Sequence, residues 1–66
     1  MTKLTSYIRI VGSKKHISFY HNGAEISAAR FNELLVEYSL KDPNFTHKHH
    51  NNSAVTEIND TFIFAI

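Results

Sequence analysis

The stretch from Ser27 to Lys41, SAARFNELLVEYSLK, constrains the fold of this 66-residue chain more than any other segment. Its large apolar residues recur at intervals of three and four positions: Phe31, Leu34, Leu35 and Tyr38. That spacing places them on one face of an α-helix. Ser27 is a suitable N-cap, and Asp42-Pro43 predicts the end of the helix because the residue before proline avoids the α region. The sequence therefore predicts one amphipathic helix that needs an apolar layer to pack against.

Two segments before the helix alternate between apolar and polar residues, which is typical of half-buried strands. They are residues 4–11 and 16–21, separated by the polar turn Gly12-Ser13-Lys14-Lys15, so we expect an antiparallel hairpin. Asn22-Gly23 is the strongest turn signal in the chain, because both residues tolerate positive φ. It predicts that residues 24–26 return as a short third strand.

The segment after the helix changes character twice. Residues 43–53, PNFTHKHHNNS, are the most polar stretch and predict an exposed loop. Residues 61–66, TFIFAI, are apolar on both faces and predict a central strand or one covered on both sides. Residues 54–58 are a further candidate strand, with Asn59-Asp60 as the turn between the two.

Together these elements predict an α+β fold in a single domain, residues 1–66. We expect a mainly antiparallel sheet of three to five strands with one amphipathic helix packed on one face, in the order β-β-(β)-α-(β)-β. The expected core combines the apolar positions of the helix with one side of the sheet: Leu4, Ile8, Ile10, Ile17, Phe19, Ile26, Phe31, Leu34, Leu35, Tyr38, Ile58, Phe62 and Phe64.

Composition excludes several classes of protein. A net charge of +1 is too small to indicate nucleic acid or an acidic partner, and it excludes a strongly acidic imitation of DNA. The chain has no cysteine, so neither a disulfide nor a cysteine-based zinc site is expected. No apolar run approaches the roughly 20 residues of a membrane span. We therefore expect a cytoplasmic protein without a membrane segment.

Two surfaces are candidates for contact with a partner. The side of the sheet opposite the core presents Tyr7, Arg9 and Tyr20, with Lys14 and Lys15 at the turn, and Tyr and Arg are enriched at protein interfaces. Val36 and Leu40 form a second apolar edge on the helix. We expect another protein as partner and self-association, as a dimer, through one of these surfaces. The alternative is a nucleic acid, which aromatic and basic residues on an open sheet also bind.

A third hypothesis rests on the histidines of the polar segment. His47, His49 and His50 lie within four residues, and imidazole is the commonest metal ligand. A working site needs three or four ligands in fixed geometry, so these three are weak candidates for a metal-binding role.

No pattern of catalytic residues is present. The chain lacks a nucleophile elbow, a phosphate-binding glycine loop and an HExxH motif, so we expect neither an enzyme nor a bound cofactor. The leading hypothesis is a small intracellular regulator or inhibitor that acts by protein contact, of the kind that phages and other mobile elements encode.

Overall fold

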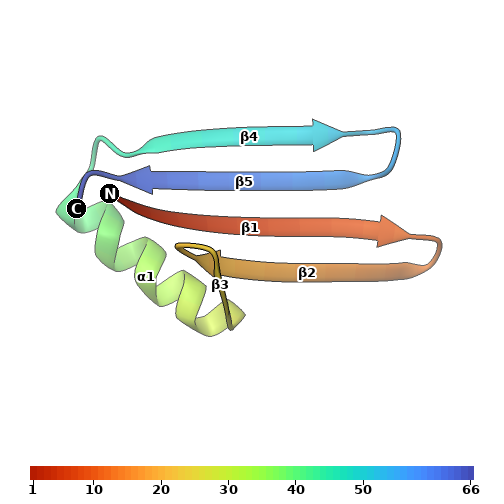
Figure 1. Ribbon diagram of the computed structural model, residues 1–66, viewed down its shortest axis with the longest axis horizontal. Helices are drawn as coiled ribbons and strands as arrows, with labels where there is room; N and C mark the ends of the chain where they lie inside the picture. The colour runs from red at the N-terminus through yellow and green to blue at the C-terminus, as the bar shows by residue number, and fades with distance from the viewer.

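A computed structural model describes residues 1–66 as one helix and one five-stranded sheet (Figure 1). The elements, in chain order, are β1 (Thr2–Val11), β2 (Lys14–His21), β3 (Ala24–Ile26), α1 (Ala28–Lys41), β4 (Thr46–Asn52) and β5 (Glu57–Phe64). All neighbouring strands are antiparallel, and their order across the sheet is β3-β2-β1-β5-β4. The predicted α+β class and element order are confirmed.

The N-terminal half folds as its turn residues predict. Asn22 and Gly23 have φ angles of 50° and 88°, and they let β3 fold back on β2. Asn22 is also tied to β1, because its backbone N–H donates to the Lys3 carbonyl oxygen (2.9 Å) and its Oδ1 accepts from the Lys3 N–H (2.8 Å). The turn between β1 and β2 contains only two residues, so β2 begins at Lys14 rather than at the expected His16.

The prediction of a loop over residues 43–53 is wrong for most of that segment. Thr46–Asn52 forms β4, which pairs with β5 at the edge of the sheet. Every residue of β4 is exposed, so its polar side chains remain in water while its backbone joins the ladder. Side-chain polarity suggested a loop, whereas the backbone hydrogen bonds that β5 offers decide the conformation.

The predicted turn at Asn59-Asp60 is also wrong, and residues 54–58 are not a separate strand. Both Asn59 and Asp60 lie inside β5, and the actual turn is formed by residues 53–56. The physical reason is the alternation of β5, which keeps Ile58, Phe62 and Phe64 on one face. A turn at 59–60 would break that register, and the turn preference of Asn and Asp is too weak to prevail.

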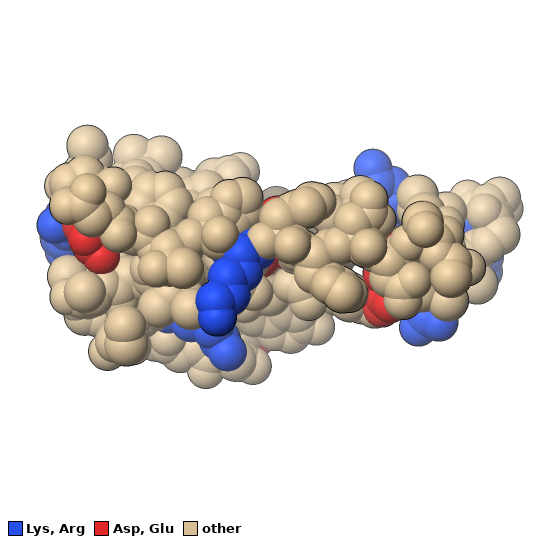
Figure 2. Space-filling model, turned by 90° about the horizontal axis from the view of Figure 1, so that it is seen from above, with Lys and Arg blue, Asp and Glu red and all other residues tan.

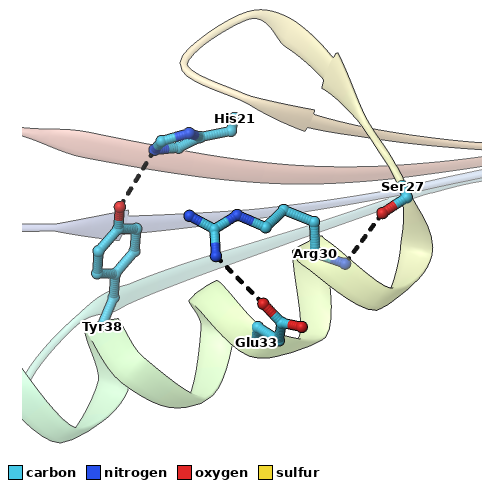
Figure 3. Close-up of polar contacts among 5 residues, drawn as sticks. All are labelled: His21, Ser27, Arg30, Glu33 and Tyr38. Atoms are coloured by element: carbon cyan, nitrogen blue, oxygen red, sulfur yellow. Dashed lines mark hydrogen bonds and ion pairs between the residues drawn. The ribbon is translucent and has the colours of Figure 1, made fainter.

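Helix α1 is capped at its start and hydrogen-bonded to the sheet near its other end. The Ser27 side chain accepts a hydrogen bond from the Arg30 backbone N–H at 3.1 Å, as predicted for an N-cap (Figure 3). Near the other end, the Tyr38 hydroxyl lies 3.3 Å from His21 Nε2 on β2 (Figure 3). The Arg30–Glu33 ion pair lies on the exposed side of the helix and contributes little.

The core is small and aromatic. Four side chains are buried, and they come from the helix and from the ends of two strands: Leu4, Phe31, Leu34 and Phe64. Partly buried neighbours surround them: Phe19, Ile26, Leu35, Tyr38, Phe45 and Phe62. The Phe31 ring centre lies 4.8 Å from that of Phe19 on β2, and the Tyr38 ring centre lies 5.5 Å from that of Phe64 on β5, so the rings join the helix to both halves of the sheet.

Part of the predicted core lies outside it. Ile10 and Ile17 are 39% and 48% exposed, and Ile8 and Ile58 are only half-buried. The reason is length: a helix of 14 residues spans roughly 21 Å, whereas the molecule is 39 Å long. Figure 1 shows α1 at the end of the molecule that holds both termini, while the two hairpins extend beyond it. We call Ile8, Ile10, Ile17 and Ile58 the isoleucine surface.

Candidate functional site

The side of the sheet that faces away from α1, here called the reverse face, collects most of the predicted partner-binding residues. Strand pairing places Arg9 between His16 and Glu57, and Tyr7 between Ser18 and Asn59. Tyr20 lies two positions along from Ser18 on the same face, next to Glu25 of β3. The structure therefore brings Tyr7, Arg9, Lys14 and Tyr20 together on one open face.

Lys15 does not belong to this group. It pairs with Ile10, on the side of the sheet that carries α1. The sequence placed Lys14 and Lys15 together in a turn, but the turn is shorter, so both are strand residues. Adjacent residues of a strand point to opposite faces, which separates the two lysines.

The reverse face has an internal polar contact that holds Tyr7 in place. The Tyr7 hydroxyl donates a hydrogen bond to the Glu57 carboxylate. This hydrogen bond, with a smaller contribution from desolvation, raises the pKa of Tyr7 above its ordinary value. Next to Tyr7, Asn59 Oδ1 is buried without a hydrogen-bond partner.

The charges of the chain are unevenly divided between the two sides of the sheet. The alternation of the strands assigns four of the seven Lys and Arg residues to the reverse face: Lys3, Arg9, Lys14 and Lys48. It assigns only two carboxylates to that face, Glu25 and Glu57. The reverse face is therefore basic, although the edge view in Figure 2 shows charged groups scattered in small clusters.

The second predicted contact, the apolar helix edge, is open. Val36 and Leu40 are 61% and 78% exposed, one turn apart on α1. They lie on the side of α1 opposite the buried Phe31 and Leu34, so the reverse face and this edge are in different layers of the molecule.

The three candidate metal ligands do not converge. His47 and His49 lie on the α1 side of β4, where His47 Nε2 and His49 Nδ1 are 2.9 and 2.7 Å from the same oxygen of Asp60. His50 falls on the reverse face, opposite Asn59. No group of three or more His, Cys, Asp or Glu residues has a geometry that could hold a metal ion. The sequence did not identify Asp60 as a partner of these histidines, because the pattern Asn59-Asp60 predicted a turn.

The Asp60 cluster predicts a dependence of stability on pH. The hydrogen bond from His49, assisted by that from His47, lowers the Asp60 pKa against the opposing effect of burial. The unfolded chain therefore binds this proton more readily than the folded chain, and the stabilisation disappears as pH falls through the folded pKa. We expect Asp60→Asn to cost about 1 kcal/mol at neutral pH and almost nothing near pH 2, measured by urea unfolding.

Glu33→Gln is the matched control, because Glu33 forms an exposed pair with Arg30 on the helix surface. It should change the unfolding free energy by less than about 0.5 kcal/mol at either pH. A cost for Asp60→Asn that is equal at the two pH values would contradict the assigned role of the carboxylate.

Comparisons with protein-family models, with curated proteins and with solved structures find no match to this chain. Its class therefore comes from its own structure. The chain is a small α+β protein with a five-stranded antiparallel sheet and one helix. No pocket is found on its surface. No helix is long and apolar enough to cross a membrane.

Proposed function

We propose that this chain is a small cytoplasmic protein-binding module that regulates or inhibits another protein by contact alone. The partner docks an acidic surface on the reverse face. The observation that carries the proposal is the gathering of Tyr7, Arg9 and Tyr20 with Lys14 on one open side of the sheet. Tyr and Arg are the residues most enriched among the energetic hot spots of interfaces.

The position of these residues in the sheet favours tight binding. Tyr7 and Arg9 belong to β1, which is the central strand and is paired on both sides. The ladder fixes the backbone at both positions before a partner arrives, and the Tyr7 side chain is also held by its hydrogen bond to Glu57. Preorganised side chains lose less conformational entropy on binding. The excess of cations on this face accelerates association with an acidic partner.

A crosslinking experiment identifies the partner, and variants then test the face. A photoreactive phenylalanine analogue at position 20 should form a covalent adduct with the partner in cells, whereas the analogue at exposed position 33 on the helix should not. We expect Arg9→Ala or Tyr20→Ala to weaken binding of the identified partner by about 30-fold, as loss of a hot spot does.

Arg30→Ala is the matched control, because Arg30 is an exposed cation on α1, in the other layer of the molecule. It should leave the affinity within about twofold. Equal adduct formation from positions 20 and 33, or equal loss of affinity in Arg9→Ala and Arg30→Ala, would refute the proposal.

A single-stranded nucleic acid is the second candidate, and the excess of Lys and Arg beside two tyrosines on a flat sheet is what favours it. Bases stack on aromatic rings, and cations neutralise phosphates. With four cations on the face, the logarithm of the binding constant should fall with the logarithm of salt concentration with a slope of about −3. A single-stranded probe that shows this slope and is released by Tyr20→Ala would replace the protein partner by a nucleic acid.

A further inference from the structure

Strand β4 forms the longer of the two edges of the sheet. The other edge is β3, which has three residues, whereas β4 has seven. The pairing of β4 with β5 runs without interruption from Thr46 to Asn52, so no bulge bends this edge away. Along an edge strand, every second residue directs its backbone N–H and C=O away from the sheet. Figure 1 shows no element beyond β4, so these groups are unpaired within the chain.

The side chains of β4 oppose pairing with a second copy of the chain. The strand THKHHNN contains one lysine and three histidines but no carboxylate. In an antiparallel pair of two β4 strands centred on His49, Lys48 lies opposite His50 of the second copy, and no acidic group balances either. A lysine is a common protection of an edge strand against such self-pairing. The same lysine attracts a strand that carries carboxylates.

We propose that β4 binds an extended acidic segment of another protein, which adds to the sheet as a sixth strand. Backbone hydrogen bonds to the unpaired groups of β4 hold the segment, and side chains select it. The selection is for acid because Lys48 and His50 project on the reverse-face side, and their neighbours on β5 there are the uncharged Thr61 and Asn59. None of the ion pairs of the chain includes Lys48, so its charge is free for a ligand.

The other side of β4 favours neutral residues in the incoming strand. His47 and His49 project there, and both are already engaged by the carboxylate of Asp60. The His47 ring also stacks on Phe62, with ring centres 4.4 Å apart. These contacts fix β4 on β5 without using its outer edge. The expected ligand therefore alternates acidic residues, toward the reverse face, with neutral residues, toward the α1 side.

This inference goes beyond the proposed function, because it uses the backbone of β4 and not the side chains of Tyr7, Arg9 and Tyr20. Those three residues lie on β1 and β2, which β5 separates from β4. Lys48 is the one residue that both surfaces share. Peptides that pair with a strand edge therefore test this inference separately from the partner of the reverse face.

The probe is a peptide that alternates glutamate with threonine and has seven residues, to match β4. Two-dimensional NMR of the nitrogen-labelled chain should show saturable shifts of the β4 amide signals. We expect a dissociation constant of about 100 μM, because a short flexible peptide loses conformational entropy on binding. The same peptide with glutamine in place of glutamate should bind about tenfold more weakly. A fully N-methylated glutamate peptide, which keeps the charges but donates no backbone hydrogen bond, should not bind.

A charge reversal on the strand tests the selection for acid. Lys48→Glu should bind the glutamate peptide about tenfold more weakly and should bind the corresponding lysine peptide instead. Lys15→Glu is the matched control, because it makes the same change of charge on β2, away from β4. It should leave the affinity for the glutamate peptide within about twofold. Both lysines are exposed, and circular dichroism checks that both variants are folded.

Four results would overturn strand addition at β4. One is the absence of any saturable shift at about 2 mM peptide, and another is equal binding of the N-methylated peptide, which would mean contact through charge alone. Shifts confined to Tyr7, Arg9 and Tyr20 would place the acidic ligand on the reverse face. Self-association of the free chain that His49→Pro or His50→Pro abolishes would assign the edge to a second copy. None of these results contradicts the proposed contact through the reverse face.

Discussion

Leu4→Ala should lower the free energy of unfolding by about 3 kcal/mol, whereas Ile10→Ala, on the same strand and the same face, should cost about 1 kcal/mol or less. Leu4 is fully buried under α1, and its truncation leaves a cavity that the surrounding aromatic rings cannot close. Ile10 is 39% exposed beyond the end of the helix, so removal of its side chain opens no cavity. The difference between the two losses of unfolding free energy shows how far along the sheet the core extends.

Urea unfolding followed by circular dichroism measures both values. Equal costs for Leu4→Ala and Ile10→Ala in the monomer would mean that the core runs the full length of the sheet, contrary to this fold.

Phe64→Ala should have the largest effect of any single truncation, about 4 kcal/mol, while Ile63→Ala should cost about 1 kcal/mol. Phe64 is fully buried between Tyr38 and Phe45, with ring centres 5.5 and 5.1 Å away. Ile63 is the preceding residue, half-buried on the reverse face. A domain of this size has few kcal/mol to lose, so Phe64→Ala is expected to be largely unfolded at 25 °C.

Phe64→Leu keeps the comparison measurable if the alanine variant does not fold. It should cost about 1.5 kcal/mol, still more than Ile63→Leu, because only position 64 is fully enclosed. Thermal unfolding of the four variants gives the order directly. A larger cost at position 63 would place the C-terminal strand with its opposite face against the helix.

The sequence predicts those parts of the fold that depend on local pattern. The spacing of Phe31, Leu34 and Tyr38 identifies α1, and Ser27 marks its start. Asn22-Gly23 identifies the turn into β3, because few residue pairs tolerate two positive φ angles. Each of these signals is confined to a few neighbouring residues, which is why no other part of the chain overrides it.

The sequence fails where pairing with a distant strand decides the outcome. The polar run Thr46–Asn52 has no strand pattern of its own and becomes β4 because β5 offers an unpaired edge. Asn59 and Asp60 look like a turn and instead lie opposite β1. In both cases backbone hydrogen bonds between remote segments outweigh local preference.

The residues of the candidate site were also predicted from local pattern in part, and missed where distant pairing decides their position. Strand alternation places Tyr7, Arg9 and Tyr20 on one face, and the structure keeps them there. Lys15 was misplaced because it was assigned to the turn, whereas β2 begins at Lys14 and strand alternation puts Lys15 on the α1 side of the sheet. The Asp60 cluster required the register of β4 on β5, which brings His47 and His49 to one carboxylate.

The amino-acid sequence by itself determined which side of each strand and helix is apolar, because that depends only on residue spacing. Only the tertiary structure decided how much of that apolar surface is covered. A 14-residue helix rises too little to shield strands in a 39 Å molecule, so Leu4 and Phe64 are enclosed while Ile10 and Ile17 stay open. The uncovered isoleucines follow from this mismatch in length between two layers.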